Sequence, residues 1–451
     1  MARMNKDPVH TPSPSLPHSK KLKVAFVLHP FLGSRDHVST HIAVHEVARR
    51  LASTCSVSVY KGRGSEAEAT GAKDGVEYRY IKIPSENQYV RLLCKLPVLR
   101  KLRGSVSFKS SWYYWGLALQ IALDARAQGC DIVHILNLSQ FAPIIRALNP
   151  KAKIVLHMHC EWLTRLNPTS IRRRLKKVDF VFSCSDFVTK QIRDALPEFA
   201  RRSATLYNGV EVQRFFPRVQ TSEADPIKRL LYVGVVCPHK GLHVLLDALP
   251  AVVKRYPNFR LDIVGQHSFM LPLDWLSTLG EPKAMARLVR FYDGKGYVWH
   301  LKEQIARLNL ADYVQFSGEI SRDDLTERYR QADLFVFPSL WNELFGMPTA
   351  EANSSGVAVV TSRIAGLPEV VEHEKTGLLV PPGDSTALAD AIIRLLEDEN
   401  LRRSMGQAGR ERVLQHFTWD KIVQDLVPHY QALMGAEKSC AMETSIVDSK
   451  P

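Results

Sequence analysis

Residues Leu334–Thr361 read LFVFPSLWNELFGMPTAEANSSGVAVVT, and this stretch decides the fold class. A short apolar run ends at Pro338-Ser339 and a loop follows. A helix is predicted from about Pro348, because a proline in the first turn loses no hydrogen bond. A second apolar run, Val357–Thr361, comes soon after the helix. Two buried strands joined by a helix predict a βαβ unit with parallel strands.

The same alternation of apolar runs and helical patterns continues on both sides of this unit. Lys21–His29 (KLKVAFVLH) is an apolar run typical of a strand buried on both faces. The cycle restarts at Lys228–Val235, after a segment rich in turn residues at 207–228. We therefore expect an α/β protein with two doubly wound, Rossmann-like domains facing a central cleft, with the ligand at the carboxyl ends of the strands.

The expected domain boundaries follow from this restart. The predicted parts are a disordered tail at 1–20, a first domain at 21–215, a linker at 216–228, a second domain at 229–417, a helix at about 418–432 that crosses back to the first domain, and a loose tail at 436–451. The first twenty residues contain four prolines and lack the apolar core of a secretory signal. Segment 267–300 has no pattern that predicts its structure.

Composition limits the class of protein and the kind of partner. The 451 residues are 45% hydrophobic, with a formal net charge of +14. Residues 1–225 hold 35 Lys and Arg against 18 Asp and Glu, a net of +17, so the positive excess lies in the first half. This asymmetry favours an anionic partner there, and nucleic acid, an anionic membrane surface and an acidic acceptor all fit.

Two basic segments account for much of this charge. Arg91–Lys109 carries six basic residues and no acid, and Trp112–Trp115 follows it; the second segment is Arg172–Lys177. Basic residues mixed with aromatic ones suit contact with anionic lipid, although a solvated face is an equal alternative. No stretch reaches the roughly 18 apolar residues of a membrane span. The seven cysteines show no disulfide or zinc spacing. We expect a cytoplasmic protein, peripheral at the inner membrane face if the basic half binds lipid.

The loop within the quoted stretch carries candidate ligand-binding residues. It delivers Phe345, Gly346 and Met347 to a helix start, where N–H groups and the positive end of the helix dipole bind anions such as a diphosphate. Gly346 would let the backbone approach a ligand closely. Glu343 and Glu351 could accept hydrogen bonds from sugar hydroxyls. Glu351 also has a purely structural explanation, because acids are common in the first helical turn.

Two further positions follow predicted strands. Lys240 comes after the strand at Lys228–Val235 and before a helix, where it would place a charge for phosphate; a solvated loop lysine is the alternative. In the first half, a strand from Lys153 ends in His157-Met-His159, where neutral imidazoles can donate and accept. Zinc needs a third or fourth ligand, which the sequence does not indicate. A Walker loop and a G-x-G-x-x-G turn are both missing from the sequence, which disfavours P-loop NTPases and NAD dehydrogenases.

Seven motifs in order resemble the retaining glycosyltransferases of family 4, the glycosyl transferases group 1, which have the GT-B fold. The motifs are Asn208-Gly-Val210 with Phe215, Val233-Gly234 with Lys240-Gly241, Phe316-Ser-Gly318, Pro338-Ser339 with Glu343 and Glu351, Ser362-Arg-Ile-Ala-Gly-Leu-Pro-Glu369, Thr376-Gly-Leu-Leu-Val-Pro381, and Phe417-Thr-Trp419. The resemblance covers about residues 21–432 and is densest over 228–420.

The resemblance implies a hexosyltransferase-like enzyme. It would move a sugar from a nucleotide diphosphate sugar, such as a UDP-sugar, to a hydroxyl acceptor with retention of configuration. Polysaccharide, glycolipid or glycoside biosynthesis would use such a reaction. The two basic segments favour a lipid-linked or anionic acceptor, and nucleic acid is not expected as a partner. The leaving phosphate itself would accept the acceptor's proton. No metal or other cofactor is implied, and the sequence has no D-x-D motif at the end of a predicted strand.

The resemblance also assigns roles to residues. Glu343 would contact the transferred sugar and His159 the sugar's 6-hydroxyl, as the catalytic pair. Glu351 would bind the ribose hydroxyls. The residues implied on the donor side are Gly234, Lys240, Glu319, Ile320, Phe345, Gly346, Met347 and Glu351, and those on the acceptor side are Gly33, Ser34 and His157.

One position departs from the family pattern. Val235 stands where an arginine is usual, five residues before Lys240. Either His239 or an arginine of the first domain supplies the missing charge, or the donor differs from the usual nucleotide diphosphate sugar. Two other functions stay open: another enzyme on the same fold, such as an epimerase or a phosphorylase, and a GT-B-like binding protein with a degenerate donor site.

Overall fold

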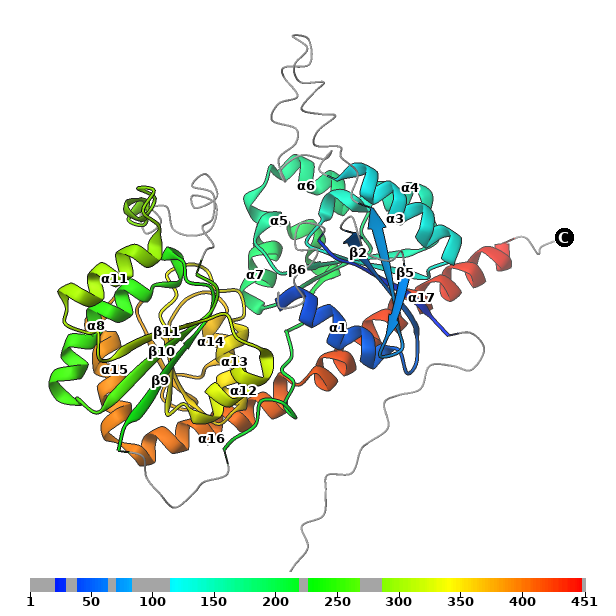
Figure 1. Cartoon of the computed structure of the whole chain (residues 1–451). Helices are drawn as coiled ribbons and strands as arrows, with labels where there is room; N and C mark the ends of the chain where they lie inside the picture. The colour runs from blue at the N-terminus through cyan, green and yellow to red at the C-terminus, as the bar shows by residue number, and fades with distance from the viewer. Residues whose placement is uncertain are drawn as a thin grey trace, which may run out of the picture. The chain divides into compact units, whose positions relative to one another are not determined.

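The computed structural model describes residues 21–29, 39–63, 70–82, 114–218, 226–267 and 286–447 (Figure 1). These residues form two sheets built mainly from parallel strands, with helices between most of them. The expected doubly wound α/β class is therefore confirmed. Segment 1–20, Gly33, Ser34 and the basic segment Arg91–Lys109 lie outside the described residues, so the predictions made for them stay predictions.

The first sheet has the strand order β3-β4-β2-β1-β5-β6-β7-β8. Strand β1 pairs in parallel with β2 and β5, whereas β3 and β4 form an antiparallel hairpin. All five residues of β5 are buried, as the continuous apolar runs predicted. The strands are β1 Lys23–Val27, β2 Ser56–Arg63, β3 Thr70–Lys73, β4 Val76–Lys82, β5 Ile132–Leu136, β6 Lys153–Met158, β7 Phe180–Ser183 and β8 Ser203–Thr205.

Helices connect most of these strands. Helix α7 begins after Ser185, whose hydroxyl oxygen accepts a hydrogen bond from the Val188 N–H as an N-cap. The α-helices are α1 Ser39–Leu51, α3 Trp115–Gln128, α4 Ala142–Leu148, α5 Trp162–Arg165, α6 Pro168–Leu175 and α7 Asp186–Ala195.

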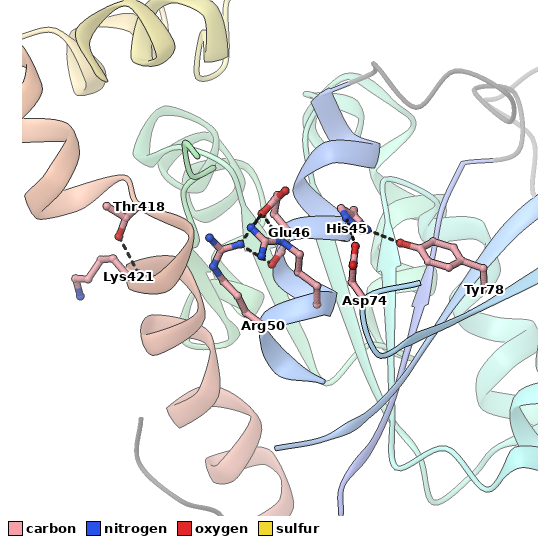
Figure 2. Close-up of polar contacts among 8 residues, drawn as sticks. His45, Glu46, Arg50, Asp74, Tyr78, Thr418 and Lys421 are labelled. Carbon is pink, nitrogen blue, oxygen red and sulfur yellow. Dashed lines mark hydrogen bonds and ion pairs between the residues drawn. The ribbon is translucent and has the colours of Figure 1, made fainter. Parts of the chain in front are cut away.

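The β3–β4 hairpin contacts α1 through a hydrogen bond and an ion pair of His45 (Figure 2). His45 of α1 places Nδ1 2.6 Å from the hydroxyl oxygen of Tyr78 on β4, and Nε2 3.4 Å from Oδ2 of Asp74 in the turn. The next residue, Glu46, pairs with Arg50 one helical turn further on. The hairpin is thus held to the helix by a polar cluster, which suits its partly exposed position.

The second sheet has the order β11-β10-β9-β12-β13-β14, and its paired strands are parallel. Its strands are β9 Lys228–Val233, β10 Phe259–Val264, β11 Val314–Gly318, β12 Leu334–Phe337, β13 Ala358–Ser362 and β14 Leu378–Val380. Its helices are α8 Leu242–Arg255, α11 Tyr297–Arg307, α12 Arg322–Gln331, α13 Met347–Ser354, α14 Leu367–Val370, α15 Ser385–Glu397 and α16 Glu399–His416.

The predicted βαβ unit is present as β12, α13 and β13. All four residues of β12 are buried and pair in register with β13. Helix α13 begins at Met347, with Gly346 before it at φ 80°, in the left-handed region that glycine adopts at little cost. The described part of segment 267–300 contributes Phe291 and Tyr297 to the core, where they are buried against His243 of α8, whereas Val289 and Trp299 are exposed.

The chain packs as two compact units, Met1–Val155 with Val423–Pro451, and Leu156–Ile422. The last helix, α17 (Trp419–Val447), contributes to both units. Its start is capped by Thr418, whose hydroxyl oxygen accepts a hydrogen bond from the Lys421 N–H at 3.1 Å (Figure 2). The helix continues to Val447, so much of the expected loose tail at 436–451 is helical. Its sequence contains no glycine or proline after Gly435 until Pro451, and so lacks a residue that would end the helix.

Candidate active site

The turn between β12 and α13 is built for a close backbone approach. A Cβ on Gly346 would lie 2.5 Å from a methyl carbon of Leu367, so a side chain there would force a shift. Phe345 and Met347 are buried, so their side chains are held in the core on either side of Gly346. Among the described residues no acceptor takes the N–H groups of residues 345–347. These N–H groups form a ready anion site at the start of α13.

Lys240 and Glu343 meet at the edge of the second sheet. Lys240 follows β9, Glu343 follows β12, and their side chains form an ion pair between Nζ and Oε2. The ammonium group also lies 5.2 Å from the ring centre of Phe337 and 5.5 Å from that of Trp341. Because β9 and β12 are neighbours in a parallel sheet, residues 103 positions apart are brought together at their carboxyl ends. A cation and an acid are thus placed beside the start of α13.

Glu351 lies buried on the first turns of α13. The hydroxyl oxygen of Tyr329 is 3.2 Å from Glu351 Oε2 and 3.2 Å from the carbonyl oxygen of Pro348. Arg322 Nη2 is 3.5 Å from Oε1. Burial raises the pKa of Glu351, and the Arg322 charge and the Tyr329 hydroxyl oppose that rise. Burying a carboxyl group costs folding free energy. Contacts with Tyr329 and Arg322 offset part of this cost, and a role in binding a ligand would be a further reason for a carboxyl group at this position.

Strands β9, β10 and β11 end at the same edge of the second sheet, each at a glycine or directly before one: Gly234, Gly265 and Gly318. Gly234 follows β9 and donates its N–H to the carbonyl of Val264, and Gly265 donates to the carbonyl of Gly318. A Cβ on Gly265 would lie 1.9 Å from the Gly234 oxygen. Glu319 and Ile320 come directly after Gly318, and Glu319 is exposed. The structure therefore brings the residues that we expected to bind the donor to one edge of the second sheet.

His239 does not replace the arginine that is missing at position 235. Its ring is buried, lies 4.7 Å from that of Trp341, and has Nε2 3.2 Å from the Cys237 sulfur. Burial, aided by the Lys240 charge, lowers its pKa to about 3, so the ring is neutral at pH 7. Of the alternatives considered for the missing charge, His239 is therefore disfavoured, because burial keeps its imidazole neutral.

The rings of His157, the fifth residue of β6, and His159, just after β6, lie side by side. Their ring centres are 4.3 Å apart, His157 is buried and His159 half-buried. Burial lowers the pKa of His159 to about 4, so its imidazole is neutral at pH 7. A neutral imidazole can donate from one nitrogen and accept at the other, which is what a sugar hydroxyl requires.

Comparisons with known proteins identify the family. The description "Glycosyltransferase Family 4" matches residues 41–214 and "Glycosyl transferases group 1" matches 214–412. The N-acetyl-alpha-D-glucosaminyl L-malate synthase of Bacillus anthracis is 35% identical over 344 residues, which cover 72% of this chain and 81% of that protein. The chain belongs to glycosyltransferase family 4.

Two further comparisons agree with this assignment. The D-inositol 3-phosphate glycosyltransferase of Saccharomonospora viridis is 30% identical to this family 4 glycosyltransferase over 263 residues, 57% of this chain and 55% of that protein. The structure of Anabaena Alr3699/HepE in complex with UDP-glucose superposes with a TM-score of 0.64 at 19% identity, covering 91% of this chain and 100% of that one. The GT-B fold and the enzyme class expected from the sequence are therefore confirmed.

Two residues of this glycosyltransferase were missed by the sequence reasoning. Glu161, three residues after Met158, is buried, and both its carboxylate oxygens accept hydrogen bonds from the side-chain amide of Asn342, at 3.1 and 3.2 Å. Asn342 directly precedes Glu343. The available signal was an acid placed immediately after an apolar strand and two histidines, where a solvent-exposed charge is not expected.

For this glycosyltransferase the structure also describes the second basic segment, and it bears on the questions of metal ligands and membrane-spanning helices. In the basic segment Arg172–Lys177, Arg172 pairs with Glu198 at 2.7 Å and Arg174 is buried, whereas Arg173, Lys176 and Lys177 are exposed. No group of three or more metal-ligating side chains occurs among the described residues. Within the same residues, no helix has the length and apolar character needed to cross a bilayer.

Proposed function

We propose that this glycosyltransferase transfers a sugar from a nucleotide diphosphate sugar to a hydroxyl acceptor, with retention of the anomeric configuration. The observation that carries the proposal is the meeting of Lys240 and Glu343 beside the open N–H groups of α13. A cation and backbone donors suit a diphosphate, and a carboxylate suits sugar hydroxyls. The fold is shared with a protein solved with UDP-glucose, which supports a donor of this class.

In this proposal, the diphosphate is held by Lys240 and by the N–H groups of Phe345, Gly346 and Met347. Their positive charge and dipoles stabilise the negative charge that develops on the leaving phosphate. Glu343 then turns to the hydroxyls of the transferred sugar. Because the acceptor attacks on the same face as the leaving phosphate departs, that phosphate accepts the acceptor's proton. The proposal includes no metal and no other cofactor.

The remaining expected residues complete the proposed site. Glu351 binds the ribose hydroxyls, and the backbone at Glu319 and Ile320 contacts the base. Gly234 lets the chain pass close to the donor. His159, neutral at pH 7, binds the sugar's 6-hydroxyl. The positions proposed on the acceptor side are His157, together with Gly33 and Ser34.

The charge distribution supports an anionic acceptor. Residues 1–225 carry a net charge of +17. Two of the relatives are named for L-malate and for D-inositol 3-phosphate, which are both anions. We propose that the acceptor is a polar anion or an anionic lipid-linked group, as in glycoside, glycolipid or polysaccharide synthesis. A cytoplasmic location, with peripheral contact to the membrane if the acceptor is a lipid, agrees with this proposal.

The test is a panel of nucleotide diphosphate sugars incubated with the full chain and with anionic acceptors. The expected result is release of a nucleoside diphosphate and formation of a glycoside whose anomeric proton, read by NMR, keeps the donor's configuration. Glu343→Ala should lower turnover at least about 100-fold. Glu327→Ala, which removes an exposed acid from α12, is the matched control.

The competing enzymes give different products in the same assay. An epimerase converts the donor sugar without an acceptor, and a phosphorylase needs inorganic phosphate and releases a sugar phosphate. A glycoside of inverted configuration would contradict the retaining mechanism. Wild-type turnover in Glu343→Ala would remove the proposed role of Glu343.

A further inference from the structure

A buried carboxylate outside the proposed donor site, that of Glu161, accepts three hydrogen bonds from neutral side-chain amides and forms one ion pair with Arg165. Glu161 Oε1 accepts hydrogen bonds from Asn342 Nδ2 at 3.1 Å and from Gln191 Nε2 at 2.9 Å, and Oε2 accepts from Asn342 at 3.2 Å. Arg165, the cation nearest in sequence, is 3.4 Å from Oε1. Burying a charge is expensive unless donors surround it. Because a buried carboxylate is costly, its hydrogen bonds to Asn342 suggest that the position of Asn342 matters for function.

Asn342 occupies the middle of the loop that carries Glu343. Backbone hydrogen bonds fix the loop on both sides of Asn342. The Leu340 N–H donates to the His239 carbonyl at 2.9 Å, and the Glu343 carbonyl accepts from the Gly366 N–H at 2.9 Å. Between these two backbone bonds, the side chain of Asn342 makes the contact with Glu161. A rotation of this peptide segment would break the contact with Glu161, and it would also displace the neighbouring Glu343.

We propose that Glu161 is a positioning residue for glycosyl transfer: through Asn342 it holds the loop in the conformation that presents Glu343 to the donor sugar. This inference rests on the role of Glu343 proposed above. Glu161 is well suited to the task because it comes three residues after β6, whose residues 154–158 are buried. An error of about 1 Å in the placement of a group at the reacting centre can lower the rate about 100-fold.

The substitution Glu161→Gln isolates this contact from the others. With its amide oxygen in the place of Oε1, the introduced glutamine still accepts from Gln191, Arg165 and Asn342. Its NH₂ group, in the place of Oε2, then faces the NH₂ group of Asn342, so that the second hydrogen bond of this pair is replaced by a contact between two donors. The loss is therefore confined to the loop. The substitution Asn342→Asp reverses the polarity of the pair, because the introduced carboxylate can accept from the NH₂ group of a glutamine at position 161.

The experiment compares Glu161→Gln, Asn342→Asp, the double variant, and Gln191→Leu as a matched control that removes a donor to the same carboxylate but does not touch the loop. Glu161→Gln should lower kcat about 10- to 100-fold, with the KM for the donor changed less than about threefold and Tm unchanged. Asn342→Asp alone should also lose activity, since two carboxylates then face each other. The double variant should regain at least about tenfold in kcat over either single variant.

Hydrogen–deuterium exchange of residues 339–346 is a second measurement that needs no donor. Exchange in this loop should rise in both single variants and return towards the wild-type rate in the double variant. Wild-type kcat in Glu161→Gln, absence of rescue in the double variant, or an equal loss in Gln191→Leu would each overturn the inference. If the wild type transfers no sugar, the proposed function fails, and the exchange pattern alone decides whether Glu161 holds the loop.

Discussion

Glu351 offers the sharpest test of the donor site, because its stability and binding effects should have opposite signs. Its carboxyl group is buried beside Tyr329 and Arg322, and burial raises its pKa. A carboxyl group whose pKa is higher in the folded state stabilises the fold below its unfolded pKa. This contribution is lost as pH rises through the folded pKa. Above its unfolded pKa, and so at neutral pH, burying this carboxyl group is therefore a cost to folding, and Glu351→Gln removes that cost.

The same substitution should weaken donor binding. Hydrogen bonds to a charged acceptor contribute about 1.5–3 kcal/mol and those to a neutral acceptor about 0.5–1.5 kcal/mol. If two ribose hydroxyls donate to Glu351, replacing the carboxylate by an amide loses about 2 kcal/mol, or about 30-fold in Kd. Tyr329 retains the carbonyl oxygen of Pro348 at 3.2 Å, so it is not left without an acceptor in the variant.

Calorimetric titration with the nucleoside diphosphate that the donor panel selects measures this loss, and urea unfolding at pH 7 measures stability. The 2′,3′-dideoxy analogue of that nucleotide is the control ligand, and it should bind wild type and Glu351→Gln equally. The reasoning is refuted if the variant loses as much affinity for the dideoxy ligand as for the natural one. A stability loss above about 2 kcal/mol would show that Glu351 serves the fold instead.

Two further predictions concern stability. Gly265→Ala should lower the free energy of unfolding by more than about 3 kcal/mol, since its Cβ would lie 1.9 Å from the Gly234 oxygen. Gly129→Ala is the control: Gly129 also has a positive φ but no atom within 4 Å of its Cβ position, so this variant should lose only about 1–2 kcal/mol. Equal losses in thermal unfolding would contradict the argument from the close approach. Burial lowers the pKa of His243 to about 3, so the unfolded state takes up a proton first and stability falls as pH drops below about 6.5. Between pH 7 and pH 5 this histidine should account for about 2 kcal/mol of the loss in the free energy of unfolding. His243→Asn should remove this loss while keeping a polar atom near the Tyr297 hydroxyl. An unchanged pH dependence of urea unfolding in the variant would contradict the prediction.

Much of the fold could be predicted because it depends on local patterns. The apolar run of β12, the proline at the start of α13 and the apolar run of β13 each favour one conformation within a few residues. The end of helix α17 was harder to predict, because Gly435 is a typical stop signal and the sequence after it carries no periodic apolar stripe. The segment before α11 was harder still, since its aromatic residues are explained only by their packing against His243.

Hydrophobic patterns in the sequence were sufficient to predict two mainly parallel sheets, and to place Lys240 and Glu343 in loops after strands and Glu351 in the helix that follows the second loop. The physical reason is that hydrophobic periodicity acts over short distances, and parallel topology then places all these loops at one edge. Only the tertiary structure decided that Lys240 pairs with Glu343, that Glu161 holds Asn342 from 181 residues away, and that His239 is neutral. Such contacts join distant parts of the chain, and desolvation depends on everything that surrounds a group, so neither is written in a local pattern.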